Sequence, residues 1–228
     1  MKVTYKQHCG DDLTVVNAAR VSFDKESTFE LDYLEDEYFK TVLSERDAKL
    51  INYLARENHK SPFNHTFITL HVKAPIFVAR QLQKHEYMPI NEVSRRYVTT
   101  EPEFYVPEVW RKKADNVKQG SSDEEYRSRL DTPFMSGTVS EVVDCAMQDM
   151  VDLYRQMVAD GCAPEQARMV LPQSMYTEWF WSGTLFAWAK MYNLRITSDT
   201  QRETQEIARQ VGEIIEPLFP VSWQALTT

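Results

Sequence analysis

The most constraining feature of the sequence is a strand pattern that runs directly into a helix pattern. Residues 67–73 alternate imperfectly between apolar and polar side chains, which predicts a strand with one solvent-facing side. Pro75 suits the first turn of a helix, and the mostly apolar residues 76–82 continue that helix. We therefore expect a strand that feeds a helix whose far end carries polar residues.

Helical spacing of apolar residues dominates the rest of the chain. A capping-box pattern at Ser44 starts a predicted helix that runs to about Arg56, and a stripe from Val139 to Met157 predicts another that ends near Gly161. Further helices are predicted at residues 17–20, 165–170, 176–193 and 200–216. The chain has no internal repeat and no sharp shift in composition. We expect a single α+β domain over residues 1–228, mainly helical, with a small antiparallel or mixed sheet.

Two stretches show no regular period. Residues 24–44 are acidic and aromatic, and residues 101–132 are rich in charge, Gly and Ser. Clusters of such polar and flexible residues are typical of loops. We expect the second stretch to be a long surface excursion.

The composition excludes several classes of protein. With 34 acidic and 26 basic residues the formal charge is −8, which argues against a nucleic-acid polymer as partner, because a phosphate backbone needs a concentrated excess of Lys and Arg. Free nucleotides remain possible, since a few local cations suffice. No apolar run approaches the ~20 residues that cross a bilayer, and the first residues lack the apolar core of a signal peptide. We expect a cytoplasmic protein without membrane contact.

The three cysteines are Cys9, Cys145 and Cys162. They are too few and too scattered for a disulfide framework or a zinc site, so no metal centre is predicted. None has a visible base beside it, and we expect small buried or loop thiols.

A dense group of hydrogen-bonding side chains follows the helix predicted at residues 76–82. Gln81, Lys84 and His85 are three and four residues apart, which places them on one helix face. Further on, the chain supplies an amide, a carboxylate, a hydroxyl and a guanidinium at Asn91, Glu92, Ser94 and Arg96. Such variety suits a ligand that combines a ring of mixed donors and acceptors with a phosphate. The alternative is a solvated helix end with ion pairs four residues apart.

Five short blocks, spread in order along the chain, carry a family resemblance. They are Ala18-Ala19-Arg20-Val21-Ser22-Phe23, His59-Lys60-Ser61-Pro62-Phe63-Asn64-His65, the segment from Phe77 to Tyr97, Ala167 to Pro172 with Tyr176 to Trp179, and Asn193-Leu194-Arg195 followed by Gln201. Each block resembles a motif of the flavin-dependent thymidylate synthases. Five blocks in the family's order argue strongly against a chance match.

The resemblance implies an enzyme that converts dUMP to dTMP. A methylene carried on tetrahydrofolate would reach C5 of uracil, and a hydride from FAD, itself reduced by NADPH, would complete the methyl group. Family members assemble as homotetramers whose active sites combine several chains, so the same is expected here. Arg195 matches the arginine that lies against uracil and stabilises the anion left when N3 loses its proton. The alternative role of Arg195 is a cation on a helix dipole.

The resemblance also implies binding residues. The positions that match dUMP contacts are Gln81, Lys84, Glu92, Ser94, Arg95, Arg96, Arg168 and Arg195. Those that match flavin contacts are Ser22, Ser61, Lys84, His85, Glu86, Asn91, Glu92 and Lys190, and His59 matches a histidine near the folate. A buried structural ion pair is the alternative for Arg168, and a structural role is the alternative for His59. An aromatic stripe is expected in the core and subunit interface, at Trp179, Phe180, Trp181, Phe186 and Trp188.

The sequence departs from the family at its signature. Lys84-His85-Glu86 stands where the family has Arg-His-Arg, so one charge is reversed close to the expected flavin. Asn64 replaces a family Glu, and Arg95 stands where a small neutral residue is common. We hypothesise that these charge changes compensate one another. The positions at which many members carry Asn, Arg and Asn for the flavin are here Thr184, Phe186 and Lys190.

A nearly intact nucleotide site beside a diverged flavin site leaves three functions open. The first is an ordinary thymidylate synthase. The second is a hydroxymethyl transferase that uses the same folate carbon but lets water take the place of hydride, and the third is a nucleotide-binding protein without turnover. The stretch 24–44 is longer than expected for the family, and we interpret it as a lid or an interface extension.

Overall fold

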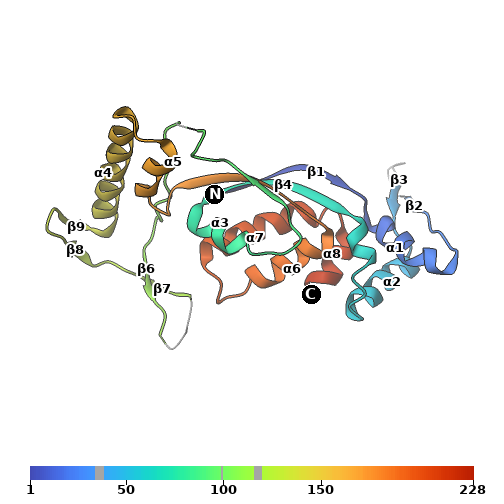
Figure 1. Ribbon diagram of the computed structural model, residues 1–228. Coiled ribbons are helices and arrows are strands. Elements are labelled where there is room, and N and C mark those ends of the chain that lie inside the picture. Colours follow the sequence, from blue (N-terminus) through green and yellow to red (C-terminus); the bar gives the residue numbers. More distant parts are fainter. Residues whose placement is uncertain (34–38, 99, 116–119) are drawn as a thin grey trace.

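A four-stranded antiparallel sheet forms the centre of the molecule (Figure 1). The computed structural model describes residues 1–33, 39–98, 100–115 and 120–228. The strands of the sheet follow the order β1 (Lys2–Cys9), β4 (Phe67–Pro75), β10 (Tyr176–Gly183) and β5 (Ile90–Glu92), and each neighbouring pair is antiparallel. The predicted combination of helices with a small antiparallel sheet is confirmed.

β4 confirms the strand that was predicted near the middle of the chain. Its alternate residues Leu70 and Val72 are completely buried, and their register partners on β10 are Trp181 and Trp179. Lys73, one position along, is only half-buried on the opposite face. Because successive strand residues point to opposite sides, one face of the sheet builds the core and the other carries polar groups.

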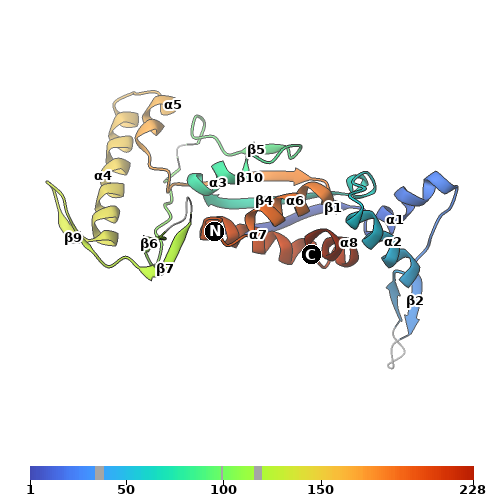
Figure 2. The ribbon, with the colours of Figure 1, turned by 90° about the horizontal axis from the view of Figure 1, so that it is seen from below.

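Helices gather on one side of this sheet in both views (Figures 1 and 2). They are α3 (Ile76–Leu82), α6 (Leu185–Arg195), α7 (Arg202–Ile215) and α8 (Pro220–Thr227). α7 confirms the helix predicted at residues 200–216, and its stripe Ile207, Val211 and Ile215 is completely buried. Pro75 precedes α3 in an extended conformation as its N-cap, so it lies just outside the first turn in which it was predicted.

The single helix predicted from Tyr176 is wrong in its first half. β10 occupies that half, and α6 begins only after Thr184. Within β10 the buried residues Trp179 and Trp181 alternate with less buried ones, which is the period of a strand. Thr184 then starts α6, because its Oγ1 accepts the backbone N–H of Ala187 at 3.3 Å. A short aromatic run fits either period, so pairing with β4 decides its conformation.

One end of the sheet carries the N-terminal helices and a hairpin. These elements are α1 (Asp12–Arg20), the 3-10 helices η1 (Val21–Phe23) and η2 (Pro62–His65), α2 (Glu45–Arg56), and the strands β2 (Glu30–Tyr33) and β3 (Phe39–Val42). The predicted start of α2 is confirmed, since Ser44 Oγ accepts the backbone N–H of Asp47 at 3.2 Å. The buried carboxylate of Asp12 accepts the backbone N–H groups of Val221 and Ser222 at 2.8 and 2.9 Å, which anchors α8 against α1. The stretch 24–44 thus contains a β2–β3 hairpin, and its residues 34–38 lie outside the described residues.

The opposite end carries a long helix that stands away from the sheet (Figures 1 and 2). This helix, α4 (Val139–Ala159), confirms the helix predicted from Val139, and Gly161 follows it with a φ of +90°. The predicted stripe is wrong as the buried face, because Met150 and Leu153 are exposed and α4 instead buries Met147, Val151 and Tyr154. The helix predicted at residues 165–170 is instead a short α5 (Pro164–Ala167) followed by a 3-10 helix, η3 (Arg168–Val170). Cys9 on β1 and Cys145 on α4 are exposed, so the prediction of buried or loop thiols is wrong for these two.

The excursion predicted at residues 101–132 contains one short hairpin and the first strand of a second one. β6 (Arg111–Lys113) pairs with β7 (Ser121–Glu125), and β8 (Arg129–Asp131) pairs with β9 (Ser136–Thr138). Their side chains are mostly polar and exposed, so no alternation of apolar residues marked them in the sequence. Within the described ranges, no helix has the length and apolar character needed to cross a membrane.

Candidate active site

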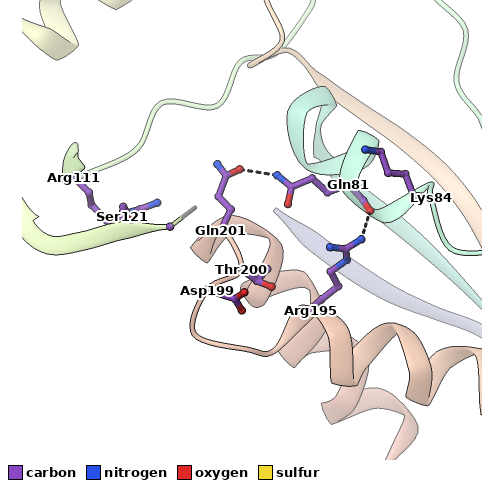
Figure 3. A pocket seen from close by; sticks show the side chains of 9 residues that line it. Gln81, Lys84, Arg111, Ser121, Arg195, Asp199, Thr200 and Gln201 are labelled. Atoms are coloured by element: carbon purple, nitrogen blue, oxygen red, sulfur yellow. Dashed lines mark hydrogen bonds between the residues drawn. The ribbon is translucent and has the colours of Figure 1, made fainter. Parts of the chain in front are cut away.

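A cleft of about 530 Å³ opens beside the last turn of α6 (Figure 3). It is lined by Gln81, Lys84, Arg111, Gly120, Ser121, Arg195, Asp199, Thr200 and Gln201. Its volume lies in the range of sites for small organic ligands. The cleft brings together three predicted nucleotide residues, of which Gln81 comes from α3, Lys84 from the turn after it and Arg195 from the end of α6.

Arg195 is held across the cleft wall by two uncharged groups. Its Nη2 donates to the backbone carbonyl of Gln81 at 2.9 Å, and its Nε donates to Nε2 of His85 at 3.0 Å. Figure 3 shows the first of these bonds and the guanidinium lying beside α3. Although Arg195 lies in the last turn of α6, these bonds direct its guanidinium to the neighbouring helix. A role restricted to the helix dipole does not account for this geometry.

The partner His85 is neutral at physiological pH. Burial, reinforced by the positive charges of Arg195 and Lys190, lowers the pKa of His85 to about 4. Only a neutral imidazole has a lone pair on Nε2 that can accept from Arg195. Burial also lowers the pKa of Arg195, but a guanidinium remains charged at neutral pH. The site therefore contains a partly desolvated cation whose hydrogen-bond partners carry no compensating charge.

Gln81 connects this cation to α7. Its amide Nε2 donates to Oε1 of Gln201 at 2.7 Å, and its Oε1 accepts from the hydroxyl of Thr204 at 3.1 Å. The main chain of Gln81 thus positions Arg195 while its side chain is fixed from the other direction. The two sides of this part of the cleft form one hydrogen-bonded unit (Figure 3).

The far wall of the cleft comes from the β6–β7 hairpin, which the sequence did not connect with the site. Arg111 donates from Nε to Ser121 Oγ at 2.7 Å and from Nη2 to both carboxylate oxygens of Glu203 at 2.7 and 3.0 Å. Tyr105 donates to the same carboxylate at 3.3 Å, and burial next to Glu203 raises the pKa of Tyr105 to about 12. In the sequence, nothing distinguishes Arg111 from the exposed charged residues around it. The sequence alone therefore gave no indication that Arg111 lines the cleft.

Several predicted nucleotide residues lie outside this cleft. Glu92 ends β5, Ser94, Arg95 and Arg96 follow it, and Arg168 begins η3. Arg96 Nε lies 3.6 Å from a carboxylate oxygen of Glu165, and Arg168 Nε donates to the Glu165 carbonyl at 3.2 Å. Arg168 is exposed, so the alternative of a buried structural ion pair is wrong. A single protomer therefore assembles only part of the predicted nucleotide set.

Glu92 itself is bonded at both carboxylate oxygens. Oε1 accepts from the hydroxyl of Thr177 at 2.6 Å, and Oε2 accepts from the amide of Gln83 at 3.2 Å. It lines a separate groove of about 430 Å³ on the polar face of the sheet, together with Asn91 and Arg95. The predicted contacts thus follow the outer face of the sheet as well as the cleft at Arg195.

A third hollow, of about 910 Å³, lies between α1 and α2. Three predicted cofactor residues line it together, namely Ser22, His59 and Ser61. Four cationic side chains also line it, and they are Arg20, Lys25, Arg46 and Lys49. Hydroxyl groups beside clustered cations suit the phosphates of a dinucleotide. The aromatic and aliphatic residues of the lining, such as Tyr53 and Leu50, suit a flat ring.

Two residues that depart from the family pattern contact each other. The hydroxyl of Thr184 donates to Oδ1 of Asn64 at 2.7 Å, which joins the start of α6 to η2. Phe186, another departing residue, lies under the ammonium of Lys60, 5.5 Å from the ring centroid. These substitutions therefore form a local set of contacts. Trp179, Trp181 and Trp188 are buried as expected for the aromatic stripe, whereas Phe180 is exposed and Phe186 is half-buried.

Comparisons with known proteins agree with this arrangement of motifs. A family model described as "Thymidylate synthase complementing protein" matches residues 5–221. The chain is 38% identical over 216 residues to a flavin-dependent thymidylate synthase of Thermus thermophilus, covering 95% of this chain and 72% of that protein. A second relative of the same description, from Thermosipho africanus, is 34% identical over 216 residues, with 95% and 86% covered.

A solved structure shares the fold. It is a UMP/dUMP methylase, PolB, from Streptomyces cacaoi bound with 5-Br dUMP, with a TM-score of 0.77 and 29% identity over 99% of this chain and 94% of that one. The family model and the curated relatives both extend over nearly the whole chain. The chain therefore belongs to the family of flavin-dependent thymidylate synthases.

Proposed function

We propose that this protein is a thymidylate synthase that converts dUMP to dTMP, with methylene-tetrahydrofolate as carbon donor and FAD, reduced by NADPH, as hydride source. The observation that carries the proposal is the Arg195 guanidinium, fixed in a cleft by the neutral His85 and by the Gln81 carbonyl. Membership of the family and the dUMP-methylase fold neighbour support the choice of substrate.

Arg195 supplies the electrostatic part of the mechanism. Uracil becomes a better carbon nucleophile at C5 when N3 loses its proton, and a cation against the ring favours that anion. Because the two hydrogen-bond partners His85 and the Gln81 carbonyl are uncharged, neither of them neutralises the positive charge of Arg195. The bonds to α3 also fix the direction of the guanidinium, so little reorganisation is needed during the reaction.

We infer that the active site is completed by other copies of the chain in a homotetramer. Within one protomer the cleft at Arg195 lacks Ser94, Arg96 and Arg168, although all three are candidates for the nucleotide phosphate. Arg96 and Arg168 are both exposed and lie close to Glu165, where a neighbouring protomer could use them. Association of identical subunits is the usual way in which such a divided site is assembled.

The residues in the hollow between α1 and α2 fit FAD. Lys25, Arg46 and the hydroxyls of Ser22 and Ser61 would hold its phosphates, and His59 would lie near the folate. When bound, the flavin supplies the hydride that completes the methyl group. His85, Glu86, Asn91 and Lys190 lie outside this hollow, so the proposed flavin contacts would also come from more than one chain.

One assay tests the proposal directly. The purified protein is examined for bound flavin by its visible spectrum and is then incubated with dUMP, methylene-tetrahydrofolate and NADPH before mass analysis of the nucleotide. A product heavier by one methylene group is expected. A hydroxymethylated nucleotide would instead support the hydroxymethyl transferase, and a protein that binds dUMP without any product would support a binding module.

A further inference from the structure

The wall of the cleft opposite Arg195 has no role in the proposed reaction, yet it is firmly built. Arg111 and Ser121 line this wall, and Figure 3 shows them across the cleft from Arg195 and Lys84. Arg111 is bound to Glu203 in the first turn of α7 through two hydrogen bonds from Nη2. The hairpin is therefore fixed to the body of the protein by an interaction that is nearly closed to solvent, with Arg111 18% and Glu203 6% exposed in their side chains.

The charge of this wall differs from that of the opposite side. Glu203 neutralises Arg111 directly, and burial, which alone would raise the pKa of Glu203, is outweighed by the bonds from Arg111, so that this pKa is lowered and the acid stays ionised. The other side presents Lys84 and Arg195, and the hydrogen bonds of Arg195 go to the uncharged His85 and to the Gln81 carbonyl. The wall therefore offers hydrogen-bonding groups with little net charge.

The available groups on this wall can both donate and accept. Among the described residues no hydrogen bond uses Nη1 of Arg111, which leaves its N–H groups to donate. Ser121 Oγ accepts from Arg111 Nε, and it retains a lone pair and its own proton. A phosphate dianion prefers a concentrated positive charge, whereas a hydroxyl needs one donor and one acceptor side by side.

We propose that Arg111 and Ser121 form a subsite for the sugar hydroxyl of the nucleotide whose ring lies against Arg195. This inference rests on the proposed function, because it takes dUMP as the ligand of the cleft. In dUMP the only free sugar hydroxyl is the one at C3′. That hydroxyl would accept from Arg111 Nη1 and donate to Ser121 Oγ, with Glu203 as the positioning residue for Arg111.

The subsite is tested by comparing how wild type and matched variants bind two nucleotides that differ only in the 3′-hydroxyl. The flavin-loaded protein is titrated with dUMP and with 2′,3′-dideoxyuridine monophosphate, and both dissociation constants are measured by calorimetry. We expect wild type to bind the dideoxy nucleotide about 10-fold more weakly, because a hydrogen bond from a charged donor is lost. Ser121→Ala and Arg111→Met each remove one of the two proposed bonds, so each should bind dUMP about 3-fold to 10-fold more weakly and should distinguish the two ligands less than wild type does.

The controls separate a lost contact from a lost fold. Lys112→Ala changes the adjacent hairpin residue, whose ammonium pairs with Glu124 in solvent, and it should keep the wild-type ratio of the two constants. If Arg111→Met does not fold because Glu203 is left unpaired, Ser121→Ala and the double variant Arg111→Met, Glu203→Gln answer the same question.

The outcomes also distinguish this inference from the proposed function. If wild type binds dUMP and the variants keep its preference for the 3′-hydroxyl, the subsite is disproved while the proposed function stands. If wild type does not bind dUMP at all, both are overturned. Equal binding of the two ligands by wild type would also contradict the subsite.

Discussion

The cleft at Arg195 and the hollow between α1 and α2 each contain a half-buried arginine, but the hydrogen-bond partners of the two differ. Among the described residues, the hydrogen-bond partners of Arg195 are uncharged, namely the Gln81 carbonyl and His85. Arg20, which lines the hollow, is instead paired with Asp47, and their side chains are 11% and 4% exposed. A partly desolvated cation that is hydrogen-bonded only to uncharged groups is costly, which fits the proposal that an anionic nucleotide binds beside Arg195. The Arg20–Asp47 pair holds α1 to α2 and shapes the hollow around it.

Removing the acid of the structural pair should have the largest effect. Asp47→Ala leaves Arg20 buried and unpaired, and we expect a loss of about 3–5 kcal/mol in the free energy of unfolding, measured by urea denaturation. Glu45→Ala on the same helix removes only an exposed pair with Lys49 and should change the stability by less than about 0.5 kcal/mol. Equal effects of the two variants would contradict the assignment of Asp47 as structural.

The corresponding change at Arg195 should affect catalysis instead of folding. Arg195→Met removes the cation, and we expect the turnover number for dTMP formation to fall about 100-fold to 1000-fold, as for the loss of a preorganised electrostatic group. Arg195→Lys should recover only a small part of the lost turnover number, because an ammonium lacks the planar fork that binds His85 and Gln81 together. The melting temperature should stay near that of wild type. A large fall in it would mean that Arg195 is structural like Arg20.

His85, the hydrogen-bond partner of Arg195, should make the stability of the protein depend on pH. Its folded pKa of about 4 is below the ordinary histidine pKa of 6.5, so the unfolded chain binds more protons between these values. The contribution of His85 is therefore complete above pH 6.5 and is lost as the pH falls towards 4. We expect the free energy of unfolding of wild type, measured by urea denaturation, to fall over this window by about 1–2 kcal/mol more than that of His85→Gln, after allowing for partial exposure. Parallel pH profiles of the two proteins would refute the depressed pKa.

The bond between Asn64 and Thr184 joins the two regions. Thr184→Ala removes this bond and the N-cap of α6, the helix that carries Arg195, and should lower the stability by about 1 kcal/mol. Thr184→Ser keeps the hydroxyl, so thermal unfolding should show it to be close to wild type. A similar loss in both variants would assign the effect to the methyl group.

The smallest expected change concerns the reversed charge of the signature. If Glu86, Asn64 and Arg95 compensate one another, Glu86→Arg alone should weaken flavin retention several-fold, measured as the ratio of flavin absorbance to protein after gel filtration. Lys2→Glu, an exposed charge reversal on β1, is the control and should leave this ratio unchanged. Higher flavin retention in Glu86→Arg would disprove the compensation.

Local signals in the sequence predicted many elements correctly. The Ser44 cap, the stripe from Val139 and the stripe of α7 involve neighbours within a few residues, and such patterns specify a helix by themselves. The strand at Leu70 and Val72 was marked in the same way by alternation. The motif blocks also identified Gln81, Lys84 and Arg195, which do line one cleft.

Tertiary contacts decided the remainder. Tyr176–Gly183 is a strand because it pairs with β4. The ion pair between Arg111 and Glu203 holds the polar β6–β7 hairpin against the cleft, although the two residues are far apart in the chain. No short-range pattern encodes either contact, because each joins residues far apart in the chain. The sequence by itself determined the local helices and the identity of the family. Only the tertiary structure decided that Arg20 is paired with an acid while the described hydrogen-bond partners of Arg195 are uncharged, since burial and pairing depend on the packed environment.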